Sequence, residues 1–239
     1  MYLKMFPDKR TALINIAQTF DEMRAMILEK GEAVSKVTNG KIPSNPFAGG
    51  RSDRKSIVQK GVFKIDKEIA DENFKLVIKH NGHFTFMLKE LMTQYPCFTT
   101  IRNPLAVIAS WNSINAPVSK GNLNVLRALN SVLYNRLNAI PDLIERQVEL
   151  LDHIYKELRE IHSGHIIKYE ELVTDPAQVL SAIHPEAYML KETLENKNKN
   201  KNYTTDLIEN TGRMLIDKGR YWKEFYSDKE IWSLMEKYN

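Results

Sequence analysis

Four short apolar runs, each followed by a stretch with helical periodicity, constrain the fold of this chain more than any other feature. The runs cover residues 2–6, 74–80, 97–101 and 165–172. In the first intervening stretch, residues 11–30, apolar side chains recur every three or four positions before Gly31 stops the pattern. Strands that alternate with helices favour a sheet covered by helices. The pattern therefore predicts an α/β fold with a central, mostly parallel sheet flanked by helices.

No internal repeat or change of composition divides the chain, so the sequence predicts a single domain over residues 1–239. Two polar stretches, residues 38–56 and 195–202, are expected to be loops, the second of them solvated. Further helices are expected over residues 84–95, 127–140, 142–162 and most of 206–238, and from Asp175 onward. The tryptophans are expected to pack in the core, namely Trp111, Trp222 and Trp232.

Composition and charge disfavour several classes of protein. The net charge is only +4, and no basic patch is interleaved with aromatic residues, which argues against a nucleic-acid binder. Cys97 is the only cysteine, so no internal disulfide can form and a reducing compartment is expected. No stretch approaches the roughly 18 uninterrupted apolar residues of a membrane span, and the N-terminus lacks the apolar core of a signal peptide. We therefore expect a cytoplasmic protein without a membrane span.

Polar residues end three of the four expected strands. Lys79 and His80 end the second, Arg102 ends the third, and Tyr169 with Glu170 ends the fourth. The carboxyl ends of parallel strands meet at one edge of a sheet and form the usual binding crevice of α/β proteins. We therefore expect these side chains to gather at one site.

The junction after Arg102 has the features of an anion site. Asn103 can cap the helix that follows, and Pro104 suits its first position. The N–H groups and the dipole of a helix N-terminus favour an anion, and Arg102 adds a full charge. Ser110, eight residues after Arg102, adds a hydroxyl. From the residues alone, the alternative is that Arg102 pairs with a carboxylate such as Glu170 while Ser110 caps its own helix.

This junction also carries a family resemblance. The segment TTIRNPLAVIASW, residues 99–111, closely resembles the 3′-phosphate-binding strand and helix of sulfotransferases, the enzymes that use 3′-phosphoadenosine-5′-phosphosulfate (PAPS). The family's Arg and Ser, eight residues apart, fall on Arg102 and Ser110. The segment IIKYEELVTDPAQVL, residues 166–180, resembles the family's Tyr-Glu-Asp-Leu strand end and the following helix. By this resemblance Tyr169 is the tyrosine beside the adenine.

Two further segments are similar to the family and follow in its order. Residues 218–225, KGRYWKEF, resemble the C-terminal Arg-Lys-Gly segment that closes over the nucleotide; Lys218 and Gly219 match, and Asp217 stands where the Arg would be. Residues 75–84, KLVIKHNGHF, resemble the strand end that carries the catalytic histidine. The resemblance implies a three-layer, P-loop NTPase-like fold.

The front of the chain departs from the family. Its 5′-phosphosulfate loop reads approximately Pro-Lys/Arg-Ser-Gly-Thr-Thr, whereas this chain has Pro7, Asp8, Lys9, Arg10 and Thr11. Arg10 replaces a glycine that lets the backbone wrap closely around the phosphosulfate. Either Lys9, Arg10 and Thr11 form a degenerate cofactor-binding loop, or the family's first strand and loop lie outside this sequence.

A second phosphate-loop candidate lies at residues 49–56, GGRSDRKS. It is one residue from the pattern G-x-x-x-x-G-K-[ST], with Arg54 in place of the second Gly. Such a loop follows a buried strand and opens a helix. Here it follows IPSNPFA, which is not a strand pattern. The context therefore disfavours a nucleotide-triphosphate loop.

Sulfuryl transfer requires a group that accepts the proton of the acceptor hydroxyl, and histidine suits this role near neutral pH. His80 is the first candidate base and His83 the alternative, and either could instead cap the helix from Phe84. Lys79 and Lys9 are candidates to stabilise the bridging oxygen. No grouping of His, Cys, Asp and Glu has metal-ligand spacing, and the family reaction needs no metal.

The sequence therefore favours a sulfotransferase that moves a sulfuryl group from PAPS, leaving 3′,5′-adenosine bisphosphate (PAP), to a hydroxyl or amine of a small-molecule, lipid or sugar acceptor. The acceptor pocket is expected from loops near residues 38–60, 112–125 and 190–210. One alternative is a sulfotransferase-like domain that binds a nucleotide or a partner without catalysis. Another is a P-loop kinase that uses ATP and Mg²⁺. The sequence leaves the oligomeric state open.

Overall fold

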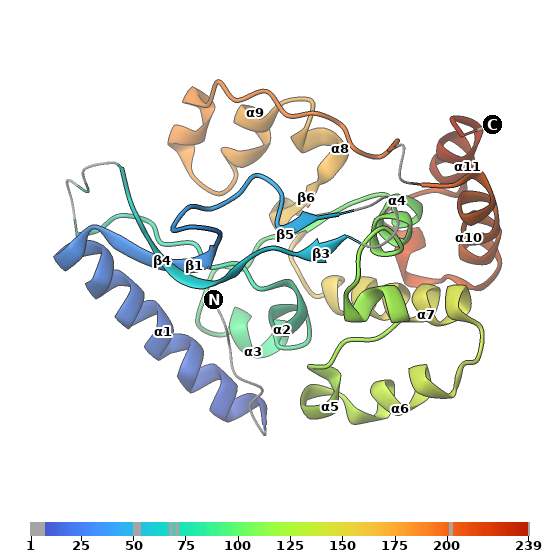
Figure 1. Cartoon of the computed structure of the whole chain (residues 1–239), viewed down its shortest axis with the longest axis horizontal. Coiled ribbons are helices and arrows are strands. Elements are labelled where there is room, and N and C mark those ends of the chain that lie inside the picture. The colour runs from blue at the N-terminus through green and yellow to red at the C-terminus, as the bar shows by residue number, and fades with distance from the viewer. Residues whose placement is uncertain (1–7, 50–53, 67–68, 70–71, 201–202, 239) are drawn as a thin grey trace.

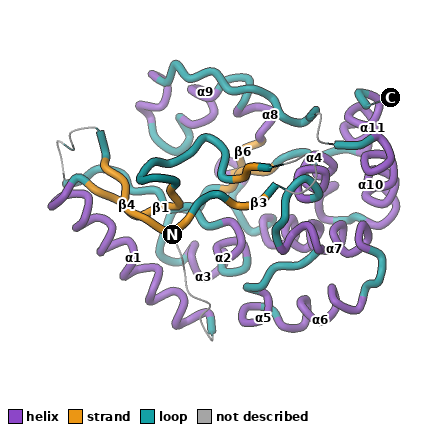
Figure 2. Tube along the Cα trace, in the orientation of Figure 1, coloured by secondary structure: helices purple, strands orange, loops and turns teal. Residues whose placement is uncertain are grey.

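The computed structural model describes residues 8–49, 54–66, 69, 72–200 and 203–238 and shows a mixed helical and sheet structure in which helices predominate (Figures 1 and 2). The helices are α1 (Lys9–Lys30), α2 (Asn81–Thr85), α3 (Leu88–Met92), α4 (Pro104–Trp111), α5 (Leu126–Leu129), α6 (Ser131–Ala139), α7 (Leu143–Leu158), α8 (Tyr169–Leu172), α9 (Pro176–Leu180), α10 (Thr205–Lys218) and α11 (Asp228–Glu236). Single 3₁₀ turns are η1 (Pro117–Lys120), η2 (Ser163–His165), η3 (Pro185–Met189) and η4 (Tyr221–Glu224). None of the helices in these ranges is long and apolar enough to cross a membrane.

The strands of the described residues form three two-stranded sheets. β1 (Glu32–Val37) pairs antiparallel with β4 (Gln59–Lys64), and β2 (Phe47–Ala48) pairs antiparallel with β3 (Lys55–Ser56). β5 (Thr99–Ile101) pairs parallel with β6 (Ile166–Lys168), with Thr100 opposite Ile167. Only one of these three strand pairs, β5–β6, is parallel. The described residues therefore do not form the expected central, mostly parallel sheet. The β1–β4 hairpin lies beside α1 at one end of the molecule, and α10 and α11 lie at the other (Figure 1).

Two of the expected strands differ from the prediction, and a third lies outside the described residues. Residues 74–80 alternate between half-buried and exposed side chains, as in a strand, but they pair with no described strand. The segment expected as a strand at 165–172 forms β6 only to Lys168, and Tyr169 already begins α8. The strand expected at residues 2–6 lies outside the described part of the chain. The hairpin β1–β4 was missed, because the long loop between its strands separates the two patterns.

The helix α4 is the most completely buried element of the fold. Asn103 caps it through a hydrogen bond that its side-chain oxygen accepts from the backbone N–H of Leu105 at 3.0 Å, and Pro104 occupies its first turn, as predicted. Leu105, Ala106, Ile108 and Ala109 are all buried. Such a helix must be surrounded on most sides, because burying its apolar surface is what stabilises it.

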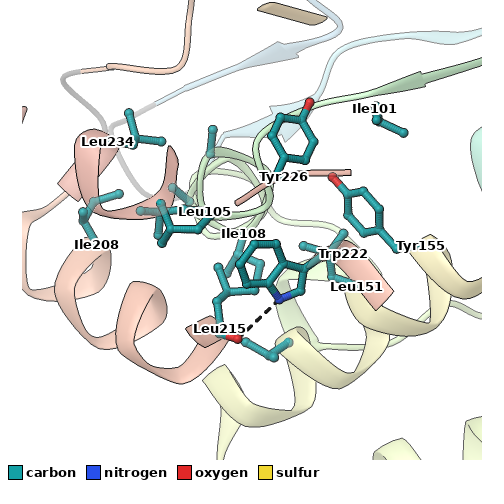
Figure 3. Close-up of a cluster of buried hydrophobic side chains, with 14 of the residues drawn as sticks. Ile101, Leu105, Ile108, Leu151, Tyr155, Ile208, Leu215, Trp222, Tyr226 and Leu234 are labelled. Atoms are coloured by element: carbon teal, nitrogen blue, oxygen red, sulfur yellow. Dashed lines mark hydrogen bonds between the residues drawn. The ribbon is translucent and has the colours of Figure 1, made fainter. Parts of the chain in front are cut away.

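The main core packs around α4 and draws on α7, α10, η4 and α11 (Figure 3). Trp222 is completely buried in it, and its indole N–H donates to the carbonyl of Leu215 at 3.3 Å. Buried Asp152 of α7 holds this region, because one carboxylate oxygen accepts backbone N–H bonds from Arg220, Tyr221 and Trp222 at 2.7 to 3.2 Å. The expectation that the tryptophans pack in the core holds for Trp222 and for Trp111, which packs against the core.

Trp232 departs from that expectation, because 42% of its surface is exposed. The two tryptophans therefore form a matched pair for testing the core. We expect Trp222→Ala to lower the free energy of unfolding by about 3–5 kcal/mol, since it removes a large buried side chain and leaves a cavity. Trp232→Ala should cost less than about 1 kcal/mol. Chemical denaturation of both variants measures the difference, and equal losses would contradict this description of the core.

Candidate functional site

The parallel pair β5–β6 brings two of the predicted site residues together. Ile101 lies opposite Lys168, so Arg102 and Tyr169 follow neighbouring strand ends. The guanidinium carbon of Arg102 lies 4.7 Å from the centre of the Tyr169 ring, which is a cation–π contact. The structure therefore places an arginine over an aromatic ring at the carboxyl edge of the sheet. We call Arg102, Tyr169 and Glu170 the Arg102 group.

Residues 195–200, named here the strap, lie across this edge and occupy the hydrogen-bond donors of Arg102. Its Nε donates to the side-chain oxygen of Asn198 at 2.7 Å, and its Nη2 donates to the carbonyl of Lys197 at 2.6 Å. Tyr169 is bound in the same way, because its hydroxyl donates to the carbonyl of Glu195 and accepts from the backbone N–H of Lys197. Residues 195–200 form a mostly exposed loop, as expected, and this loop also bonds to Arg102 and Tyr169.

Glu170 joins the strap to the rest of the site. Its Oε1 accepts from the backbone N–H of Asn103 at 3.0 Å and from the side-chain amide of Asn198 at 2.6 Å. Its Oε2 accepts from the hydroxyl of Tyr226 at 2.8 Å. Glu170 thus forms no ion pair with Arg102, and among the described residues no other carboxylate does so. The alternative in which Arg102 pairs with Glu170 does not describe this structure.

Two buried tyrosines hold the site, Tyr155 through the backbone and Tyr226 through the Glu170 carboxylate. The hydroxyl of Tyr155 donates to the carbonyl of Arg102 at 2.5 Å. Burial raises the pKa of Tyr155, and burial together with the neighbouring Tyr155 and Glu170 raises the pKa of Tyr226. Both phenols therefore keep their protons at neutral pH and act as hydrogen-bond donors. Sequence reasoning missed both of them: Tyr155 lies within a helix far from any motif, and Tyr226 directly follows the segment 218–225 without being part of it.

Ser110 is not brought next to Arg102. It lies in the last turn of α4, where its carbonyl accepts hydrogen bonds from the backbone and the hydroxyl of Ser113. Six residues separate it from Pro104, which corresponds to about 9 Å along the helix axis. The two residues that the resemblance assigns to one phosphate are therefore near opposite ends of α4.

Lys218 and Gly219 lie at a third place, the end of α10. The Lys218 ammonium donates to Oε1 of Glu145, in the first turn of α7, at 2.5 Å. Tyr155, which reaches Arg102, follows Glu145 by ten residues, or about 15 Å of helix. Gly219 is required by packing, because a Cβ there would lie 1.9 Å from the indole nitrogen of Trp222. The structure thus gives both residues partners away from the Arg102 group.

The candidate front loop forms the first turn of α1. Asp8 caps this helix, accepting the backbone N–H of Thr11 at 2.8 Å and the Thr11 hydroxyl at 2.8 Å. These bonds, led by the one from the backbone, lower the pKa of the Asp8 carboxyl. Lys9 pairs with Glu90 at 2.9 Å, and Arg10 is exposed. A carboxylate thus already occupies the helix N-terminus where an anion would bind.

The second candidate phosphate loop lacks the required context. Residues 50–53 lie outside the described residues, and Lys55–Ser56 form the strand β3 instead of opening a helix. Arg54 is bound elsewhere, because its guanidinium donates to the carbonyl and the hydroxyl of Ser113. These contacts join the loop to the end of α4.

His80 and His83 form a compact pair at the start of α2. Their rings meet edge to face with centres 4.4 Å apart, and their Nδ1 atoms are 3.3 Å apart. His80 caps α2, as the sequence left open, through Nδ1, which accepts from the backbone N–H of His83 at 3.5 Å. Nε2 of His83 is buried and has no hydrogen-bond partner. Lys79 is exposed beside the pair.

The surroundings keep both imidazoles neutral. Burial, with a smaller effect of the neighbouring His83, lowers the pKa of His80 to about 4, and burial lowers the pKa of His83. A neutral imidazole with an unpartnered nitrogen can accept a proton or a hydrogen bond from a ligand. Among the residues that the structure describes, no three His, Cys, Asp or Glu side chains are grouped to hold a metal ion.

Comparison of the chain with protein-family models, with curated proteins and with solved structures finds no significant match.

The histidine pair predicts a defined pH dependence. The unfolded chain protonates His80 near the ordinary pKa of 6.5, and the folded chain does so only at about 4. The contribution of His80 to the free energy of unfolding is therefore fully present above pH 6.5 and is lost as the pH falls toward 4. We expect an NMR titration to show His80 neutral at pH 5.5 to 6, and His83→Gln to raise the pKa of His80.

The corresponding stability measurement uses a variant. His80→Gln should flatten the loss of unfolding free energy between pH 6.5 and 4, because it removes the group that takes up a proton in this range. A His80 that titrates at its ordinary pKa would refute the description of a buried neutral pair.

Proposed function

We propose that this chain is a sulfotransferase that uses PAPS, built on a three-layer P-loop architecture, with the Arg102 group as the site for the 3′-phosphate end of the nucleotide. The observation that carries the proposal is the cation–π pair of Arg102 and Tyr169 at adjacent parallel strand ends. The resemblance of residues 99–111 and 166–180 to the family's nucleotide-binding segments supports it.

The bonding of Arg102 fits an anion that can replace the strap. Its two guanidinium bonds go to a neutral amide and a carbonyl, Asn198 and Lys197, so its positive charge is not neutralised by a carboxylate. Charge-assisted hydrogen bonds from a guanidinium to a phosphate are stronger than those to neutral acceptors. A 3′-phosphate would therefore displace the strap at a gain in free energy. Tyr169 would then lie free to pack beside the adenine.

The 5′ end of the nucleotide fits less well. Asp8 already caps α1, and its negative charge opposes a second anion there. Lys9 and Thr11 are both bonded to acidic side chains. We therefore assign no step of the reaction to the first turn of α1.

PAPS supplies the activated sulfuryl group, which passes to the acceptor oxygen as the bond to the bridging oxygen breaks. The chain's own contribution is a proton acceptor, and His83 fits this role because its buried Nε2 lacks a partner. His80, whose Nδ1 is turned toward His83, would hold that ring in place. Lys79 is exposed beside the pair and could stabilise the leaving oxygen.

A second candidate function is nucleotide binding without catalysis. The carboxylate cap at the start of α1 favours it, because sulfuryl transfer requires the 5′-phosphosulfate to be held in place. Incubation with ³⁵S-labelled PAPS and a panel of hydroxyl and amine acceptors separates the two. Labelled product that disappears in His83→Ala supports catalysis, and nucleotide binding without any transfer supports the second function.

The nucleotide proposal is tested by calorimetric titration with PAP and with adenosine 5′-monophosphate, which differ by the 3′-phosphate. PAP should bind at least about tenfold more tightly without any metal, the difference expected for charge-assisted hydrogen bonds. Arg102→Gln should reduce the affinity for PAP to that for the monophosphate. Arg136→Gln, at an exposed arginine that pairs with Glu149, is the matched control. Equal affinities for both nucleotides in the unmodified chain would overturn the assignment.

The strap generates a prediction of the opposite sign. Asn198→Ala removes the side chain that accepts from Arg102 and donates to Glu170, so fewer molecules should hold the closed strap. The apparent affinity for PAP should then rise about threefold to tenfold, because it scales with the open fraction. Asn135→Ala, on the exposed part of α6, should leave the affinity unchanged. Weaker binding to Asn198→Ala would show that Asn198 holds the ligand instead of competing with it.

A further inference from the structure

A pocket lined mainly by polar residues lies at the end of α4 opposite the Arg102 group. Its volume is about 440 Å³, within the range of small-molecule sites, and its wall comes from the turns after α4, from α6 and from the start of α7. These turns belong to the expected acceptor-loop range 112–125. The lining contains four asparagines, namely Asn115, Asn122, Asn124 and Asn138.

The wall of the pocket is firmly held by groups that do not need a ligand. The Arg146 guanidinium donates to the carbonyls of Ile140, Pro141 and Lys120, so it joins the separate turns. Gly121, in the left-handed region at φ +66°, packs against the stem of Arg146, where a Cβ would lie 2.8 Å from that side chain. Completely buried Gln147 donates to the carbonyl of Ser119 at 3.0 Å. The pocket is therefore formed before any ligand arrives.

The asparagine amides, by contrast, keep unused hydrogen-bonding capacity. Asn122 donates to the side-chain oxygen of Asn138 at 2.7 Å and retains a second N–H. The side-chain amides of Asn115 and Asn124, both at exposed positions, make no hydrogen bond within the described part of the chain. The side-chain oxygen of Asn122 already accepts from the backbone N–H of Leu123, and that of Asn138 accepts from Asn122, so the fully open amides are those of Asn115 and Asn124. An open amide offers an acceptor next to a donor, which matches a ligand hydroxyl that both donates and accepts.

Charge and shape narrow the class of ligand. The lining contains Lys120 and Arg146 and no acidic residue, and Arg127 lies beside it, donating to the Tyr134 hydroxyl at 2.9 Å. The ammonium of Lys120 makes no ion pair with any described residue. Apolar surface comes from Pro117, Ala116 and the Tyr134 ring. Hydroxyls, one apolar face and a negative group are together the chemistry of an acidic sugar.

We propose that this pocket binds an anionic carbohydrate, a sugar ring that carries a carboxylate. The asparagines bind its hydroxyls, Tyr134 packs against its apolar face, and Lys120 binds the carboxylate. The inference does not rest on the proposed sulfotransferase activity, because it concerns a separate pocket and needs no nucleotide.

The test is an NMR titration of the full ¹⁵N-labelled chain with glucuronate, glucose and inorganic phosphate. Glucuronate should produce saturable shifts of the side-chain amides of Asn122 and Asn138, with an affinity about tenfold higher than glucose because of one added charge-assisted bond. Asn138→Asp, which repels the carboxylate, should abolish these shifts. Lys120→Gln should reduce the affinity for glucuronate to that for glucose. The control Asn135→Asp, at an exposed position of the same helix, should change neither the amide shifts nor the affinity for glucuronate.

Three outcomes overturn the proposal. No saturable shift with either sugar shows that the pocket binds no monosaccharide, and the same shifts with phosphate show a site for simple anions. Equal affinities for glucose and glucuronate show that Lys120 does not bind the carboxylate of the sugar. The Arg102→Gln variant separates the sites, since it should keep the glucuronate response while losing the affinity for the bisphosphate.

Discussion

The carboxylate of Glu170 is the interaction on which the arrangement of the site depends. It connects three segments far apart in the sequence: the start of α4 through the N–H of Asn103, the strap through Asn198, and the C-terminal region through Tyr226. A half-buried carboxylate is tolerated only when its oxygens accept hydrogen bonds, and here three donors supply them. Because these donors are neutral, the charge of Glu170 is solvated by the protein while Arg102, beside it, keeps its own charge uncompensated by an ion pair.

That arrangement explains why the strap can be both ordered and replaceable. Its bonds to Arg102 are made by an amide and a main-chain carbonyl, which a phosphate can outcompete. Of its lysines, Lys197 pairs with Glu195 of the strap, whereas Lys199 is exposed and adds positive potential at the same edge. The hydrogen bonds of the strap thus satisfy the Arg102 guanidinium without neutralising its charge, and this is the condition under which a half-buried arginine remains able to bind an anion.

The sequence predicted the features of this site that are local. The cap at Asn103 and the placement of Pro104 depend only on neighbouring residues, and both were found. The contact of Arg102 with Tyr169 followed from two strand ends that share a parallel edge. Residues 74–80 show the limit of such reasoning. Their side chains alternate in burial as in a strand, but a strand also needs a partner with unpaired backbone groups, and these residues pair with no described strand.

What the sequence could not predict is the pairing between distant segments. Asn198 lies 96 residues after Arg102 in a low-complexity tract, so nothing in its neighbourhood indicates that it contacts a guanidinium. The partner of Lys218 was equally hidden, since Glu145 lies 73 residues before it, although Lys218 fits a family motif by its position. A motif fixes the type of residue, whereas only the packing decides whether its polar atoms are available to a ligand.

The helix α4 finally sets the relation between the two candidate sites. The Arg102 group lies before its first turn and the asparagine pocket follows its last, so its eight residues separate them by about 12 Å. Because α4 is buried on most sides, it cannot bend or shift without disrupting the main core. The separation is therefore fixed. Two small ligands, one at the Arg102 group and one in the asparagine pocket, would therefore bind independently. The two sites could be coupled only by a ligand that extends along the length of α4, or by two ligands that touch each other.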